Sequence, residues 1–203
     1  NLAWCYEHGK GVEKNEKRAL AWYQKAADQG DPRGMYCVGR AYDYGRGTER
    51  DIKAAVGWYQ KAAEAGSVSA MCDLGVCYER GEGVEQNLEK AVELYRRAAE
   101  RGDATGQCNL GHMYESGRGV AKDWVQAAKW YGAAAEQGSP RAQYHLAWCY
   151  EHAAGVQQDL TKALALYEAA AAQQYEDAEK QVQRLRKPPE KGKFLRGLFG
   201  RHG

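Results

Sequence analysis

Apolar and polar residues alternate along this chain with the period of an α-helix. Between residues 69 and 80, Ala70, Leu74, Cys77 and Tyr78 follow one another at i, i+4, i+7 and i+8, which places them on one helical stripe. A second stripe, at residues 91–99, predicts another helix that ends near Gly102. The unit indicated by this pattern is a pair of helices joined by a short turn.

The helix pair is repeated every 36 residues. One column of glycines and two columns of tyrosines keep this spacing in a single register, which chance does not produce. A repeat of this length indicates a solenoid, in which each unit buries its apolar face against the next. The columns contain Gly30, Gly66, Gly102 and Gly138; Tyr6, Tyr42, Tyr78, Tyr114 and Tyr150; and Tyr23, Tyr59, Tyr95, Tyr131 and Tyr167.

We therefore expect an all-α fold, a superhelix of 36-residue helix-turn-helix repeats across residues 1–187. Abundant Ala, Leu, Tyr and Trp with few β-branched residues favour closely packed helices over strands. The expected divisions are a partial repeat at 1–30, repeats at 31–66, 67–102, 103–138 and 139–174, a capping helix at 175–187 and a basic flexible tail at 188–203.

Polar residues and glycines mark the helix ends. Asn87 precedes the second stripe as an N-cap, and positions 15, 51, 123 and 159 hold Asn or Asp at the same place. Gly81 follows the first helix, where glycine adopts the left-handed cap conformation at little cost. The recurring G-x-G segments are therefore interpreted as helix caps and not as phosphate-binding loops.

Glycine also occurs inside the first helix, where it costs about 1 kcal/mol relative to alanine. Gly39, Gly75 and Gly111 hold this position, and Ala3 and Ala147 replace them in the outer repeats. The presence of only the two smallest residues predicts a close helix–helix contact. We expect the alanine pairs of the second helices to form the facing surface, at residues 26–27, 62–63, 98–99 and 134–135.

The repeat at 103–138 shows the complete pattern and can be compared with known repeat families. It contains Leu110-Gly111-x-x-Tyr114, Gly117-x-Gly119-Val120, Asp123, and Ala128-Lys129-Trp130-Tyr131 leading to Ala134-Ala135 and Gly138. This pattern, which covers about residues 1–187, resembles that of the Sel-like repeat family, relatives of the tetratricopeptide solenoids. The resemblance implies a right-handed α/α superhelix with first helices on the concave face and second helices on the convex face. It also implies a protein-binding scaffold or adaptor, in bacterial signalling, cell-envelope or host-interaction systems or in eukaryotic protein quality control.

The sequence departs from this pattern at three places. Thr48 stands where the other loops have Val. The segment 153–155 lacks the first loop glycine, so we expect an altered helix cap at Ala153. Gln183 and Arg186 replace Gly and Tyr in the last helix, which fits a capping helix with one face in water.

The formal net charge of +2 is divided unevenly along the chain. Residues 1–183 carry −4 and residues 184–203 carry +6, so no general nucleic-acid-binding surface is indicated. No apolar run reaches the ~20 residues of a membrane span. The N-terminus looks trimmed because the chain starts at Asn1, so the compartment stays unknown. Unpaired cysteines favour the cytoplasm over a periplasmic or secreted location.

No arrangement of residues predicts catalysis. The sequence has no C-x-x-C, H-E-x-x-H, G-x-S-x-G, S-x-x-K or G-x-x-x-x-G-K-[ST] segment. Equivalent cysteines of adjacent repeats are expected ~8–10 Å apart, whereas a disulfide needs Cα atoms within ~7 Å, so we expect free, packed thiols. The histidines are not spaced to share a metal. We therefore expect a non-enzymatic protein without a metal or cofactor.

An acidic column lies near the C-terminal end of the first helix, the unfavourable end for an acid. Two interpretations are open: solvated or capping side chains in the loop, or an acidic strip that attracts a basic partner. The column contains Glu7, Asp43, Glu79, Glu115 and Glu151.

Next to the core stripe, the first helices carry a face that is aromatic and mixed in charge. Trp, Tyr and Arg dominate the energetics of interfaces, so we predict a groove for a partner protein or peptide, with ordinary packing between repeats as the alternative. Its histidines would make binding sensitive to pH near 6–7. The predicted groove residues are Trp4, His8, Tyr36, Arg40, Tyr44, Val76, Arg80, His112, Tyr144, Trp148 and His152.

The basic tail follows Pro188 and Pro189, which end the capping helix. In a helix its apolar residues would share one face, ringed by basic residues. Three interpretations are open: a tail without a specific role, a short motif that binds a partner or a groove, and weak contact with an anionic membrane. The tail motif consists of Phe194, Leu195, Arg196, Leu198 and Phe199.

Three functions remain open at this point. The first is a non-enzymatic scaffold or adaptor whose concave groove receives a protein or peptide. The second is a hydrolase of cell-envelope or β-lactam substrates, of the type suggested for cysteine-rich relatives. The third is a structural solenoid that associates with itself.

Overall fold

The computed structural model describes residues 2–175 and 177–187, and these residues are entirely helical outside their turns, as the repeat pattern predicts. Each helix packs on the next one in the chain. Within this part of the chain, none of the helices has the length and apolarity needed to cross a membrane. The helices are α1 (Leu2–His8), α2 (Glu16–Asp28), α3 (Pro32–Tyr44), α4 (Ile52–Glu64), α5 (Val68–Arg80), α6 (Leu88–Glu100), α7 (Ala104–Ser116), α8 (Trp124–Glu136), α9 (Pro140–His152), α10 (Leu160–Ala172) and α11 (Ala178–Arg186).

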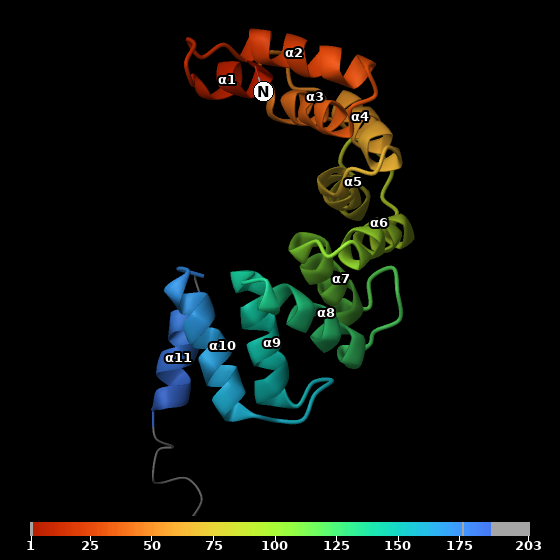
Figure 1. Cartoon of the computed structure of the whole chain (residues 1–203). Coiled ribbons are helices and arrows are strands. Elements are labelled where there is room, and N and C mark those ends of the chain that lie inside the picture. Colours follow the sequence, from red (N-terminus) through yellow and green to blue (C-terminus); the bar gives the residue numbers. More distant parts are fainter. Residues whose placement is uncertain (1, 176, 188–203) are drawn as a thin grey trace, which may run out of the picture.

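The helices form one continuous curved stack from α1 to α11 (Figure 1). In the middle of the chain, α5 lies on the inner side of the curve, and α4 and α6 lie on the outer side (Figure 1). In this part of the solenoid the first helix therefore lies on the concave side, which agrees with what the family resemblance implies.

Polar side chains cap the N-terminus of both helices in each of the four complete repeats. The predicted caps of the second helices are confirmed; for example, Asn87 accepts a hydrogen bond of 2.9 Å from the Lys90 backbone N–H. The first helices have caps that the sequence analysis missed, and Asp103 accepts from the Gly106 N–H at 2.7 Å. The signal was present, because Asp or Ser stands directly before each of these helices, at Asp31, Ser67, Asp103 and Ser139.

The cap that was expected to be altered keeps its geometry. Ala153 adopts the left-handed conformation with a φ of 54°, close to the 73° of Gly81, and its N–H still bonds to the Cys149 carbonyl. The expectation was wrong because the loop conformation is set by its neighbours. Alanine accepts strain at this position, since Cβ disfavours left-handed backbone by about 1–2 kcal/mol.

The glycines inside the first helices contact tyrosine rings. A Cβ atom at Gly75 would lie 2.5 Å from Cε1 of Tyr95, and one at Gly39 would lie 2.7 Å from Cδ1 of Tyr59. These tyrosines are fully buried. The alanine pairs were therefore the wrong partners: Ala98 instead lies against Gly106 in the first turn of the next repeat.

The second glycine of each loop permits contact between repeats. A Cβ atom at Gly83 would lie 2.7 Å from the carbonyl oxygen of Ile52, in the first turn of the preceding repeat's second helix. Gly47, Gly119 and Gly155 make the equivalent approach to the repeat before them. The G-x-G segment therefore combines a helix cap with a close backbone contact.

The last helix closes the stack. Ala178 and Val182 are buried against the preceding repeat, whereas Gln183 and Arg186 are exposed. This arrangement fits the capping role predicted for those polar residues. The tail motif at 194–199 lies outside the described residues.

Candidate functional site

The first-helix carboxylates are hydrogen-bonded to the tyrosines of the core. Each one accepts from the hydroxyl group of the tyrosine 16 residues later, on the second helix of its own repeat. Tyr95 donates to Glu79 at 2.8 Å, and Tyr131 donates to Glu115. The other pairs are Tyr23 with Glu7 at 2.6 Å, Tyr59 with Asp43 at 3.1 Å and Tyr167 with Glu151 at 3.1 Å.

A basic side chain also approaches each of these carboxylates. Arg118, from the loop of the following repeat, lies 2.6 Å from Glu79, and His145 of the next first helix lies 3.4 Å from Glu115. The remaining pairs are Arg46 with Glu7 at 3.4 Å, Arg50 with Asp43 at 3.9 Å and Arg184 with Glu151 at 2.5 Å. The acidic column is therefore mostly buried and already paired within the fold; it connects the helices of one repeat and, in most cases, links that repeat to the next.

Burial keeps the groups around the column in their neutral form. Burial and the adjacent Glu79 raise the pKa of Tyr95 well above its usual value, so this hydroxyl remains a donor. Burial also raises the pKa of the Cys149 thiol to about 12, with a contribution from Glu115. All six cysteines are free and four are buried, which confirms the packed thiols that the sequence predicts. Thiols held protonated in this way are poor nucleophiles.

Four of the predicted groove residues line one hollow at the N-terminal end, with a volume of about 750 Å³. We call it the N-terminal hollow; it also includes Arg33 and Ser69, and so spans α1, α3 and the start of α5. The predicted residues that line it are Trp4, His8, Tyr36 and Arg40.

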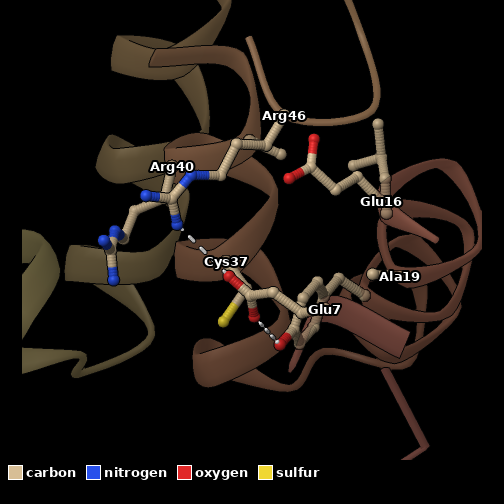
Figure 2. A pocket seen from close by; sticks show the side chains of 9 residues that line it. Glu7, Glu16, Ala19, Cys37, Arg40 and Arg46 are labelled. Atoms are coloured by element: carbon tan, nitrogen blue, oxygen red, sulfur yellow. Dashed lines mark hydrogen bonds and ion pairs between the residues drawn. The ribbon is translucent and has the colours of Figure 1, made fainter. Parts of the chain in front are cut away.

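Next to this hollow lies a pocket of about 50 Å³, too small for more than one or two waters. Figure 2 shows it lined by Glu7, Cys37 and Arg46, with the guanidinium groups of Arg40 and Arg46 on the same side. Arg46 reaches Glu7, whereas Arg40 continues past it (Figure 2). Arg40 and Arg46 therefore line both the pocket and the hollow.

A second aromatic cluster lies toward the C-terminal end, between α7, α9 and α10. The rings of His112 and His145 have centroids 6.5 Å apart, and Tyr144 packs edge-on against Tyr167 at 5.3 Å. Burial lowers the pKa of His112, an effect that the neighbouring Arg141 reinforces.

Trp148 belongs to a separate stack. Its ring lies 5.0 Å from that of Trp124 and 4.3 Å from that of His152. The same pattern occurs at the N-terminal end, where Trp4 stacks on His8 with centroids 4.6 Å apart. In both pairs the histidine ring is oriented by Nδ1, 3.0 Å from the tryptophan carbonyl oxygen.

The predicted groove residues divide into two groups. Some are exposed, with Tyr44 at 57% and Trp4 at 44%, and the core does not require them. The others are half-buried and also pack between helices. The exposed residues fit the interpretation as a partner groove, and the half-buried ones also fit ordinary packing between repeats. The exposed group is Trp4, His8, Tyr44, Arg80 and His152, and the half-buried group is Tyr36, Arg40, Val76, His112, Tyr144 and Trp148.

The geometry supports recognition more than chemistry. In the part of the chain that the structure describes, no three His, Cys, Asp or Glu side chains are grouped to hold a metal ion. Exposed aromatic rings and arginines on a concave face can contact a second molecule over several repeats.

Comparisons with known proteins agree with this architecture. The Sel1 repeat model matches at residues 1–31, 32–67, 68–103, 104–139 and 140–175. No functionally curated protein was found to be similar in sequence.

Solved structures are also similar to the chain. A Sel1 repeat protein from Oxalobacter formigenes is 37% identical, with a TM-score of 0.85 over 92% of this chain and 74% of that one. A protective antigen of uropathogenic Escherichia coli with the SLR fold is also 37% identical, with a TM-score of 0.84 over 91% of this chain but only 40% of its own length. Cysteine-rich protein B of Helicobacter pylori is 29% identical, with a TM-score of 0.52 over 66% of this chain and 96% of that one. The chain therefore belongs to the Sel1 repeat family, whose members are typically non-enzymatic and generally mediate interactions between proteins.

Proposed function

We propose that this chain is a scaffold or adaptor that binds a partner protein or peptide along the concave groove of its first helices. The observation that carries the proposal is the exposure of large aromatic side chains on these helices. Trp4 and Tyr44 leave 44% and 57% of their surface in water. Such side chains contribute most of the binding energy when a partner buries them.

The first helices that form the groove are held in place by the second helices. In each of the five helix pairs, the first helix is joined to the second by a hydrogen bond from tyrosine to carboxylate that is at least partly buried, as between Tyr95 and Glu79. A rigid surface loses little conformational entropy when it binds, which favours affinity. The groove residues are therefore presented in a fixed geometry over successive repeats.

Capture of partners by the immobilised chain tests this proposal. The variant carries Trp4→Ala and Tyr44→Ala, which remove exposed rings at little cost to the core. We expect the partners captured by the wild-type chain to be lost or reduced at least about tenfold, because two interface aromatics each contribute about 1–2 kcal/mol or more.

A matched control removes exposed apolar side chains from second helices. Val125 and Leu160, at 61% and 52% exposure, lie at the starts of α8 and α10. The Val125→Ala and Leu160→Ala double variant should capture the same partners as the wild type. Equal capture by the groove variant, or selective loss in the control, would show that the concave face is not the binding surface.

Hydrolysis receives no support from the described thiols. Burial raises the pKa of Cys77 to about 12 and that of Cys149 to about 12, so neither supplies a thiolate at neutral pH. The groove residues are proposed as contact residues only.

A further inference from the structure

The charged side chains that line the N-terminal hollow are three arginines, Arg33, Arg40 and Arg46, and two carboxylates, Glu7 and Asp31. The carboxylates of the acidic column accept hydrogen bonds from buried tyrosines and are approached by basic side chains. Asp73 accepts the Tyr36 hydroxyl at 2.9 Å, and burial raises its pKa. Asp31, at the edge of the hollow, caps α3 through the N–H groups of Arg33 and Gly34. These acids therefore already accept hydrogen bonds from within the fold, and Glu7 is also paired with Arg46.

Two arginines of the same hollow form no direct ion pair, although Asp73 is close enough to Arg40 to attract it electrostatically. Within residues 2–175 and 177–187, no carboxylate lies within ion-pair distance of the guanidinium group of Arg33 or Arg40. Both residues belong to α3, and both line the N-terminal hollow together with Trp4 and Ser69. The hollow thus combines two guanidinium groups that form no direct ion pair with an exposed aromatic ring.

Arg40 is held in place by aromatic rings. Its guanidinium carbon lies 5.9 Å from the ring centroid of Tyr36 and 5.4 Å from that of Tyr44. The neighbouring Arg46 lies 5.1 Å from the Tyr44 centroid and forms an ion pair with Glu7. A stacked guanidinium keeps its planar set of donors available at its edge, and this set matches the two oxygens of a carboxylate.

We infer that the N-terminal hollow binds an acidic segment of a partner protein, with carboxylate side chains at Arg33 and Arg40 and an apolar or aromatic residue against Trp4. This inference rests on the proposed function and specifies the chemistry of the partner. The sequence left open a basic partner attracted by the acidic column, and an acidic partner is inferred here instead. The carboxylates of that column already interact with tyrosine and basic side chains of the chain itself.

Labelled model peptides test the inference by fluorescence anisotropy on the whole chain. The probes are three six-residue peptides with the sequences EEYEEY, QQYQQY and KKYKKY, which differ only in charge. We expect EEYEEY to bind most tightly, QQYQQY more weakly and KKYKKY not measurably. Raising the salt from about 50 to 500 mM should weaken binding of EEYEEY several-fold, since exposed charges are screened.

Charge-removing variants locate the site. Arg33→Gln and Arg40→Gln should each weaken EEYEEY binding about three- to tenfold, and the double variant more than tenfold. The control is Lys53→Gln, which removes one exposed cation from α4 and should leave affinity within about twofold. Because Arg40 also packs on tyrosines, circular dichroism accompanies its variant, whereas Arg33 is exposed and its replacement leaves the core intact.

Two results would overturn the inference: tighter binding of KKYKKY than of EEYEEY, or equal affinity of the Arg33→Gln/Arg40→Gln and Lys53→Gln chains for EEYEEY. Failure of this inference is separable from failure of the proposed function. If captured partners depend on Trp4 and Tyr44 but not on Arg33 and Arg40, the groove binds partners and the acidic chemistry is wrong.

Discussion

The hydroxyl group of Tyr95 donates a hydrogen bond of 2.8 Å to Oε2 of Glu79, whose other oxygen lies 2.6 Å from Arg118. Tyr95 belongs to the second helix of the same repeat, and Arg118 follows the first helix of the next one. One carboxylate therefore fixes the two helices of a repeat and also joins that repeat to its neighbour. Similar contacts recur along the stack with the period of the sequence.

Removal of this hydroxyl should destabilise the chain. Tyr95→Phe leaves the buried ring in place but removes a hydrogen bond to a charged group, so we expect the free energy of unfolding to fall by about 2 kcal/mol. Urea unfolding followed by circular dichroism measures the change. Tyr150→Phe is the control, because the Tyr150 hydroxyl makes no hydrogen bond to the described residues and its loss should change stability by less than about 0.5 kcal/mol. Similar losses for the two variants would contradict the role of the Tyr95–Glu79 pair.

Two glycine-to-alanine substitutions should have opposite signs. Gly75→Ala would place a methyl group 2.5 Å from the Tyr95 ring, so we expect a loss of about 1–3 kcal/mol from overpacking despite the better helix propensity. Gly132, inside α8, has no atom within 4 Å of an added Cβ, and Gly132→Ala should gain about 0.5–1 kcal/mol. Thermal unfolding of both variants measures the difference. A gain at both positions would mean that the Gly75–Tyr95 contact is not tight.

Restoring the missing loop glycine should stabilise the last full repeat. Ala153 has a φ of 54°, where alanine is strained and glycine is not, so Ala153→Gly should gain about 1 kcal/mol. The reciprocal control is Gly81→Ala, at a φ of 73° in the equivalent cap, which should lose a similar amount. If both changes lowered the urea midpoint, backbone strain at Ala153 would not explain the effect.

The repeated pattern was sufficient to predict the helices and their order. It located helix pairs, the Asn and Asp caps of the second helices and the free thiols, because these depend on local sequence and spacing. It did not predict the partner of Gly75. A helical stripe defines which face is buried but does not specify whether the neighbour is Tyr95 or an alanine pair.

The candidate site was less accessible to sequence reasoning. The 16-residue offset between acid and tyrosine was visible in the columns. Whether these two side chains form a hydrogen bond depends on how the two helices of a pair are aligned, which the sequence does not show. Trp148 illustrates the same limit, since its stack with Trp124 depends on the packing of α9 on α8. The exposure of each groove residue therefore depends on how neighbouring repeats pack and cannot be predicted from one repeat alone.

Stability should depend on the protonation of His112. Burial, reinforced by Arg141 and His145 and opposed by Glu115 and Glu79, lowers the pKa of His112 below its ordinary value of 6.5. The unfolded chain therefore binds this proton more readily, so His112 contributes stability above pH 6.5 that is lost as the pH falls through 6.5 and toward the folded-state pKa.

A histidine replacement isolates this effect. Between pH 7.5 and pH 5.5, the urea midpoint of His112→Gln should fall less than that of the wild type. His152→Gln, which replaces an exposed histidine at the end of α9, should retain the wild-type loss. An unchanged pH dependence in His112→Gln would show that burial of this imidazole does not control it.

Site-specific photo-crosslinking tests the central claim most directly, because it reports which face touches a partner. A photoreactive phenylalanine analogue is placed either at position 44, exposed on α3, or at position 125, exposed on α8. The chain is then irradiated with a captured partner. We expect crosslinks from position 44 and none above background from position 125. Crosslinks of equal yield from both positions, or from position 125 alone, would contradict binding in the concave groove.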